Sequence, residues 1–483
     1  MKQYIYRVCA FVLVILLTIS VSGQAIRSTY FLKGSTYRHQ LNPAFMGERN
    51  YIAIPILGNL NVDVQGNIGV SNFIYKTDNP LKKYSQTIFM NSIVDGKNFL
   101  SGLNDNNKLE FNFNIDILAC GFYAWGGFNT LGINLRSNSD INLPYSLFDF
   151  MKTGMDKVPG SSYRINDFWM SSNNYVELAL GHSRLINEQL TVGAKLKFLF
   201  GVGNIDARFD RMDVTMSQGK WIINANGSLK ASIGGVGFKT KASNSVYQMN
   251  GQIYRRREIE GFNMGTPGLG GFGLGIDLGA TYKMDKFVKG LTLSAALLDL
   301  GFISWGNNLK GSMLTESYTF DGFRDITIDD DKSSLGDQVN NMVDDLKEFM
   351  KFYDDGRTKS RSTMLSTTIN FGAEYALPVY NKLTFGCLSS TYINKPYTWS
   401  EGRFSANVAP LSWFDASINY GISNFGSSFG WILNFHPKNF NIFVGSDHLV
   451  TKVMSRGVPE SYLNANICLG FNISFGKKNK IVK

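Results

Sequence analysis

The chain has 483 residues, of which 44% are hydrophobic, 13% aromatic and only 18% charged, and it carries a formal net charge of +10. The apolar content excludes a disordered chain, and 4 Cys are too few to staple a protein of this length. A soluble enzyme would carry more charge, whereas a protein built from membrane helices would have a mean hydropathy well above -0.09. The arrangement of the residues must explain this composition.

The first 23 residues predict a signal peptide. Lys2 and Arg7 precede a short apolar run at 8–19, and the small residues at 21–23 suit cleavage. The run is shorter than a membrane helix, and no later run in the chain approaches that length. We therefore expect an exported mature chain without a helical membrane span.

The clearest pattern lies near the C-terminus. Apolar residues occupy every second position from Leu463 to Phe475, and polar or small residues such as Asn464 and Ser474 stand between them. A period of two over thirteen residues is typical of a strand with two different faces. At about 3.3 Å per residue and a tilt of about 45°, such a strand crosses the core of a bilayer.

The same alternation recurs near 60–71, 189–200, 269–283 and 363–377. The charged residues of these segments all fall on the polar phase: Asp63, Lys195, Lys197, Asp277 and Glu374. A charge that faces lipid near the midplane costs about 2–4 kcal/mol, which explains this segregation. The polar phase is otherwise Asn, Gly, Ser and Thr, which favours a membrane barrel over a soluble β protein.

We expect fourteen membrane strands, which returns both ends of the barrel chain to the same side. The expected strands lie near 60–71, 110–121, 128–136, 173–184, 189–200, 269–283, 289–301, 363–377, 382–393, 403–409, 412–421, 428–436, 439–446 and 461–475. Loops of variable length alternate with tight turns at 185–188, 284–288, 378–381 and 437–438. Outer-membrane barrels have this asymmetry between external loops and periplasmic turns. The expected fold is all-β: a transmembrane antiparallel barrel over 58–476, followed by a basic periplasmic tail at 477–483.

Three loop segments carry apolar residues at helical spacing. The strongest covers 335–353, between Ser334 as N-cap and Gly356 as a stop, and weaker ones lie at 81–103 and 147–151. Two interpretations remain open. These stripes fold the loops onto the barrel rim, or they frame an apolar groove for a ligand outside the membrane.

Motifs of soluble enzymes are weak in this chain. Residues 268–273 match G-x-G-x-x-G, but an alternating strand follows where a dinucleotide site needs a helix, so we expect the beginning of a strand. The histidines lack metal-site spacing, and the acidic run at 329–331 lacks the glycine of a calcium loop. We expect no catalytic residues, no metal and no cofactor. The basic run at 255–257 is either solvated or in contact with lipid phosphates.

Two short segments resemble a known family. Leu41-Asn42-Pro43-Ala44-Phe45 is similar to the Asn-Pro-Ala element of long-chain fatty-acid transporter (FadL-like) outer-membrane proteins, and the segment at 299–305 resembles one that recurs in FadL-like barrels of Bacteroidota. The whole mature chain is similar to an uncharacterised Bacteroidota outer-membrane β-barrel family of that superfamily. It departs from many such barrels because it continues past Phe475 into the basic tail.

The resemblance implies a fourteen-stranded barrel whose N-terminal segment, 24–57, plugs the lumen. The segment at 51–57 also has strand character, but Pro55 and the alternation of loops and turns place it outside the barrel wall. Relatives include importers of hydrophobic compounds and shuttle or scaffold proteins of type IX secretion.

The leading hypothesis is a non-enzymatic barrel in the bacterial outer membrane that binds or passes a small hydrophobic compound. Besides the plug motif, the expected lumen residues are Asp63, Asp116, Glu177, Lys195, Lys197, Asp277, Glu374 and Asp415. They either select the ligand or pair with one another and with the plug. The second hypothesis is an envelope or secretion scaffold with protein partners, and the third is a barrel enzyme. Besides these proteins the expected partners are outer-membrane lipid and the hydrophobic small molecule; export argues against nucleic acid.

Overall fold

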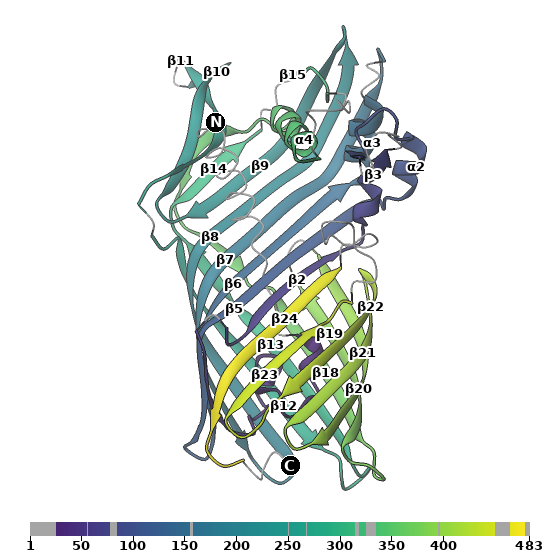
Figure 1. Ribbon diagram of the computed structural model, residues 1–483. Coiled ribbons are helices and arrows are strands. Elements are labelled where there is room, and N and C mark those ends of the chain that lie inside the picture. Colours follow the sequence, from purple (N-terminus) through teal and green to yellow (C-terminus); the bar gives the residue numbers. More distant parts are fainter. Residues whose placement is uncertain are drawn as a thin grey trace.

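The computed structural model describes residues 26–55, 57–77, 85–154, 158–249, 251–266, 268–313, 318–324, 335–394, 397–449 and 464–478 (Figure 1). The expected signal peptide, the acidic run at 329–331 and the end of the basic tail lie outside these residues. Among the described residues, no helix is both long and apolar enough to cross a membrane.

The described part of the chain forms a closed antiparallel barrel of fourteen wall strands, which confirms the expected fold (Figure 1). The wall strands are β1 (Asn50–Ala53) with β2 (Leu60–Gly66), β5 (Asn106–Ala124), β6 (Gly127–Pro144), β7 (Ser162–Leu185), β8 (Leu190–Ser217), β12 (Gly271–Lys283), β13 (Leu291–Trp305), β17 (Arg361–Met364) with β18 (Thr367–Ala376), β19 (Leu383–Ile393), β20 (Thr398–Leu411), β21 (Phe414–Ser423), β22 (Gly426–Phe435), β23 (Phe440–Ser446) and β24 (Ala465–Phe475). The ring closes where β24 pairs with β1 and β2. Closure leaves no unpaired strand edge in the membrane.

The first wall strand begins earlier than expected. Tyr51 in β1 lies opposite Ser474 in β24 and Gly121 in β5, so this segment belongs to the wall and not to the plug. The strand then bulges after Ala53, and β2 resumes the same two pairings from Leu60. The boundary expected at 57 is therefore wrong by one short strand. Pro55 lies in the bulge, where its missing N–H breaks no ladder bond.

The two ends of the barrel differ as expected. At one end, six connections within the described chain contain two to seven residues each, and we call this the short-turn end. Between β5 and β6 the turn residues Trp125 and Gly126 both have positive φ, as a two-residue type I′ hairpin requires. The opposite end, which we call the long-loop end, carries nearly all other structure.

The stretch between 201 and 268, expected as the longest external loop, is mostly strand. β8 continues upward and pairs with β9 (Lys220–Ile233), which in turn pairs with β14 (Asn308–Ser312) and β15 (Tyr318–Phe320). The hairpin of β10 (Val236–Met249) and β11 (Gln252–Met264) joins this outer sheet through β16 (Tyr353–Thr358). One side of the barrel therefore rises above the other (Figure 1). The basic run at 255–257 lies on β11.

Helices α3 (Tyr145–Thr153) and α4 (Leu335–Phe349) confirm two of the expected loop helices, although α4 ends before Gly356. Of the expected helix at 81–103, residues 81–84 lie outside the described residues. The rest of the expectation is largely wrong, because β4 (Ser85–Ile88) pairs with β3 (Ile74–Thr77) and α2 (Gly96–Ser101) is short. The apolar faces of α2, α3 and α4 pack with strands of the outer sheet into one cluster around Phe99, Phe150 and Trp221. Their stripes thus fold the loops onto the rim.

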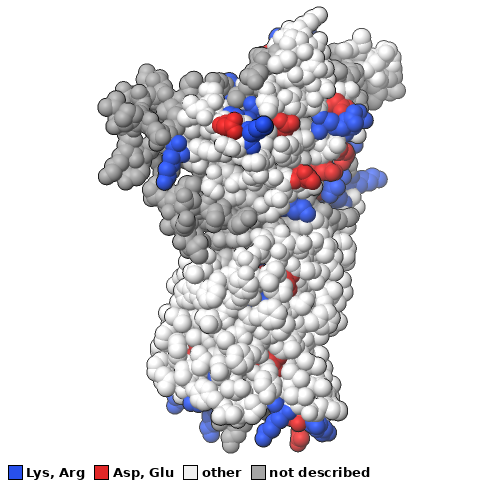
Figure 2. Space-filling model, turned by 90° about the vertical axis from the view of Figure 1, so that its right-hand side faces the viewer, with Lys and Arg blue, Asp and Glu red and all other residues white. Residues whose placement is uncertain are grey.

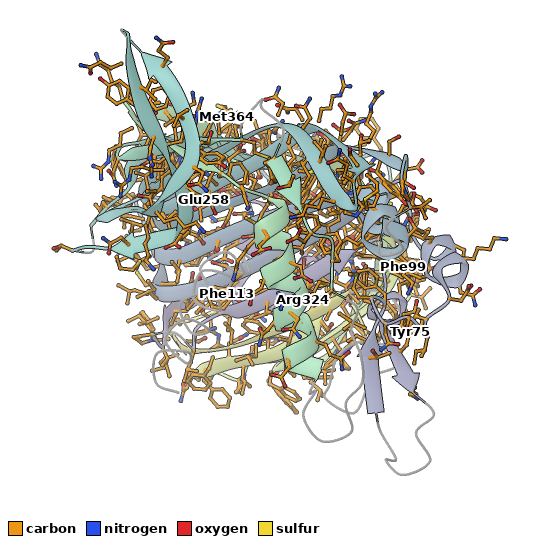
Figure 3. All side chains as sticks on the ribbon, turned by 90° about the horizontal axis from the view of Figure 1, so that it is seen from above. Tyr75, Phe99, Phe113, Glu258, Arg324 and Met364 are labelled. Atoms are coloured by element: carbon orange, nitrogen blue, oxygen red, sulfur yellow. The ribbon has the colours of Figure 1, made fainter. Side chains whose placement is uncertain are left out.

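Seen from above, α4 lies over the mouth of the barrel (Figure 3). Arg324 lies beside this helix and donates from Nε to Asp345 Oδ1 at 2.6 Å. That hydrogen bond raises the pKa of the Arg324 guanidinium.

On the face of the barrel seen in Figure 2, a broad belt shows almost no charged side chains, and most Lys, Arg, Asp and Glu gather above and below it. On β12, for example, Leu274, Ile276 and Leu278 are exposed while Asp277 is buried inside. Exposed aromatic residues such as Trp125 and Trp413 lie at the short-turn end, as in the girdles of membrane barrels. This is the surface of a membrane-spanning barrel.

Replacing Phe371, which is 60% exposed near the middle of β18, with Arg is expected to lower the free energy of unfolding by about 2–4 kcal/mol, because lipid would surround the new charge. Denaturant titration in lipid vesicles measures the change. The matched control is Val246→Arg on β10, outside the belt, which we expect to leave the free energy unchanged. Equal effects of both changes would contradict the placement of the belt.

Candidate functional site

The chain's own N-terminal segment occupies the barrel lumen. Residues 26–49 run from the level of Asp447, beyond the end of β23, down to Glu48 near the short-turn end. They include two short turns of 3-10 helix, η1 (Arg27–Thr29) and η2 (Thr36–Gln40). Most of their side chains are buried. We call residues 26–49 the plug.

The Asn42-Pro43-Ala44 motif anchors the plug to the wall. Asn42 donates from Nδ2 to the carbonyl oxygens of Ala280 and Ala295 at 3.3 and 3.2 Å, and it accepts the Ala44 N–H at 2.9 Å. These carbonyls belong to β12 and β13, so one amide ties the plug to two strands. The proline suits this tight turn because its fixed φ needs no further restraint.

Wall glycines make room for the plug. A Cβ at Gly279 would lie 2.1 Å from Asn42 Oδ1, and one at Gly193 would lie 2.1 Å from the Pro43 carbonyl oxygen. Real Cβ atoms essentially never come so close, so a side chain at either position would displace the plug. Part of the high glycine content therefore reflects this close approach of two backbones.

A first group of buried charges holds the start of the plug. The backbone N–H of Arg27 donates to Asp447 at 2.8 Å, and its guanidinium lies 3.3 Å from Glu401 and 3.9 Å from Asp63. Arg403 pairs with Glu401 at 2.7 Å and with Asp447 at 3.7 Å. Buried carboxylates need such partners, because an unpaired buried charge costs several kcal/mol. Arg27 is the plug's contribution to this group.

A second group lies within the wall. Lys197 Nζ is 2.8 Å from Asp277, 2.5 Å from Asp299 and 3.6 Å from Glu177, and Arg136 pairs with Glu177 at 3.5 Å. All five side chains face the lumen from neighbouring strands β6, β7, β8, β12 and β13. Two bases and three acids thus neutralise one another almost completely.

A bulge in β13 explains the 299–305 segment. Asp299 has φ of 58°, a left-handed conformation that Asp tolerates, and its N–H donates to Asp277 Oδ1 at 2.7 Å. The extra residues turn the Asp299 carboxylate into the lumen toward Lys197. Trp305 is fully buried, and its indole N–H donates to Thr363 Oγ1 at 2.8 Å.

All eight lumen residues expected from the sequence are buried. Four of them touch the plug: Asp63 at Arg27, Asp116 at Gln40, Glu374 at Lys33 and Asp415 at the Gly34 N–H. Glu177, Lys197 and Asp277 pair within the wall, and Lys195 lies beside them, 6% exposed. These residues therefore pair with one another and with the plug. A role in selecting the ligand stays a prediction.

A second set of side-chain contacts crosses the lumen above the plug, and we call it the upper closure. Asn138 on β6 donates to the Tyr392 hydroxyl at 2.9 Å, and Asn394 donates to Asp140 at 2.6 Å. Lys108 Nζ lies 4.1 Å from the centre of the Tyr397 ring. These contacts join β5 and β6 to the end of β19 and to Asn394 and Tyr397 before β20, on a distant part of the ring.

Sequence reasoning missed several of these side chains, including Arg27, Glu401, Arg403 and Asp447. The alternation on β20 held a signal, because Glu401 and Arg403 share the polar phase of that strand with Asn407. The strand was expected only from 403 onward. Arg27 and Asp447 lie outside any alternating segment, so no periodicity indicated them.

A pocket of about 100 Å³, open to solvent, lies between plug and wall at the short-turn end. Its lining combines the basic Lys33, Arg38 and Lys283 with Glu374 and the apolar Phe45. In the described part of the chain, no group of three or more His, Cys, Asp or Glu side chains is arranged to hold a metal ion.

Comparison with known protein families identifies the family of this chain. A family of unknown function (DUF5723) matches residues 43–447, which is most of the chain. The chain belongs to this family. No curated protein matches it.

Among solved structures, the chain is similar to several barrels at low sequence identity. The toluene transporter TbuX of Ralstonia pickettii shares 9% identity, with a TM-score of 0.43, covering 94% of this chain and 99% of that chain. The P. putida toluene transporter TodX shares 9% identity, with a TM-score of 0.37 and coverages of 90% and 92%. A Pseudomonas aeruginosa FadL homologue shares 9% identity, with a TM-score of 0.39 and coverages of 94% and 96%.

Gly279→Ala is expected to dislodge the Asn42 region of the plug, because the added Cβ takes the place of Asn42 Oδ1. Gly275→Ala on the same strand is the matched control, since its Cβ would meet nothing closer than 3.4 Å. Trypsin cleavage at Lys33 and Arg38 in the folded, detergent-solubilised protein measures exposure of the plug. We expect faster cleavage in the first variant only; equal rates would contradict the tight fit.

Proposed function

We propose that this protein is an outer-membrane barrel that binds or passes a small, predominantly apolar compound, with the plug as its gate. The observation that carries the proposal is the plug itself. It fills the lumen through side-chain and backbone contacts but contributes no strand to the wall, so it can move while the ring of strands stays closed.

The location follows from the barrel's surface and chain path. The uncharged belt suits the apolar core of a bilayer, and an even number of strands with short turns at one end is the architecture of bacterial outer-membrane barrels. The expected signal peptide supplies export. The short-turn end, to which Glu48 and Lys478 belong, then faces the periplasm, and the outer sheet faces the outside.

The choice of an apolar compound rests on what the lumen offers. Its charges are engaged in pairs, and plug and upper closure fill it along most of its length, which argues against a wide aqueous pore for hydrophilic solutes. Apolar surface is open to solvent at the short-turn end, where Ala44, Phe45 and Met46 line the pocket between plug and wall.

The outer sheet supports a second candidate, a scaffold for envelope or secretion proteins. The β10–β11 hairpin exposes Val246, Ile253 and Met264 together with the basic run at 255–257. Exposed apolar and basic side chains on a projecting hairpin are typical of protein contact surfaces. Recovery of a stable complex with large envelope proteins, lost on deletion of the hairpin, would favour this candidate.

Arg27→Ala should open the barrel, because it removes the guanidinium that the plug places beside the buried Asp63, Glu401 and Asp447 and costs the plugged state about 3–5 kcal/mol. We expect higher ion conductance in planar bilayers and faster uptake of a small aromatic hydrocarbon into liposomes. Arg164→Ala, which breaks an exposed ion pair with Asp213 outside the lumen, is the matched control and should change neither.

Deletion of residues 26–49 provides the limiting case, and it must stop before Asn50 because β1 is part of the wall. If neither the deletion variant nor the Arg27→Ala variant conducts ions or takes up the hydrocarbon, the transport hypothesis is wrong. The scaffold is then the better account.

A further inference from the structure

Three oxygen-bearing side chains form one row across the lumen face of neighbouring strands. Gln65 on β2 lies directly opposite Glu110 on β5, and Glu110 lies directly opposite Asp140 on β6. Directly opposite residues of antiparallel strands have Cβ atoms about 4.5–5.5 Å apart on the same face. The three side chains are 1%, 1% and 4% exposed. The strands lie side by side in Figure 1.

The row contains two carboxylates without a basic partner. Like charges directly opposite each other destabilise a sheet, and burial strengthens the repulsion. Among the described residues, no basic group lies within 4.0 Å of Glu110 or Asp140. Two bases of this part of the lumen are engaged elsewhere, Arg27 with three other acids and Lys108 with the Tyr397 ring.

Each side chain is oriented by one hydrogen bond. Asn112 donates to Glu110 Oε1 at 2.6 Å, Asn394 donates to Asp140 Oδ2 at 2.6 Å, and Gln65 Nε2 donates to Asp63 at 2.6 Å. The remaining oxygens of two of them, Glu110 Oε2 and Gln65 Oε1, are buried and accept no hydrogen bond. An unsatisfied buried acceptor costs about 1–3 kcal/mol, so a native protein normally provides a partner.

We propose that Gln65, Glu110 and Asp140 bind a divalent cation with the chemistry of Ca²⁺. Carboxylate and amide oxygens are the ligands that Ca²⁺ prefers, and its flexible coordination admits water for the remaining positions. Two positive charges neutralise the two carboxylates, whereas a shared proton would neutralise only one. Because Asn394 reaches Asp140 from the other wall, the cation braces the upper closure. This site is independent of what the barrel passes.

The test uses the full mature protein in detergent, with Ca²⁺ as the ligand and Tb³⁺ as a probe whose emission is sensitised by Tyr392 and Tyr397 nearby. Ca²⁺ should raise the melting temperature of the wild type above its value in chelator and displace Tb³⁺. Glu110→Gln should melt higher than wild type in chelator, because the repulsion is gone. It should lose the Ca²⁺ response and bind at least about tenfold more weakly, since affinity follows the number of charged ligands.

Asp213→Asn is the matched control, because Asp213 is an acid on the same barrel that lies outside the lumen and pairs with Arg164. It should respond to Ca²⁺ like the wild type. Should Glu110→Gln fail to fold, Gln65→Leu keeps both carboxylates and must still weaken Ca²⁺ binding. The proposal is overturned if Ca²⁺ leaves the wild type unchanged, if acid stabilises it in place of Ca²⁺, or if the folded variants bind as tightly as wild type.

Discussion

Every second residue of a closed membrane barrel faces lipid, and this constraint decides where the chain can place its charges. Within the membrane belt, acids and bases of the wall strands such as Lys197, Asp277 and Glu177 face the lumen, where they are buried and close together. They must then neutralise one another. Lys197 does this within the wall, and Arg27 does it from the plug. The plug therefore does more than fill the lumen. Through Arg27 it supplies a positive charge that balances buried acids of the wall.

The same alternation made the wall predictable from the sequence. A charge on the wrong phase is expensive, so positions such as Asp63, Lys197 and Asp277 reveal both the strands and their inner faces. Even the irregular 299–305 segment was visible as a motif. Its role was not, because the φ of Asp299 and its approach to Lys197 depend on a bulge that no periodicity encodes.

Contacts between distant segments escaped prediction for a related reason. Arg27 and Asp447 are 420 residues apart, and neither lies in an alternating strand. β1 was assigned to the plug because its local sequence does not identify it as a wall strand. Its place in the wall follows only from its pairing with β24 and β5. The outer sheet was missed because its strands lie outside the membrane: one face packs Trp221 and Ile223 against the loop helices, and the other faces water, which does not exclude charge.

The plug is held in two chemically different ways. Toward its start the contacts are ion pairs, which water can replace once the segment shifts. Around Asn42 they are hydrogen bonds to backbone carbonyls in a space that only glycines leave open, so a small displacement loses them all. Since the ring of wall strands stays closed without the plug, release from the Asn42 end disturbs no strand pairing, whereas release at Arg27 first exposes three buried carboxylates. In the gating proposed above, the Asn42 end of the plug is accordingly the part expected to move first.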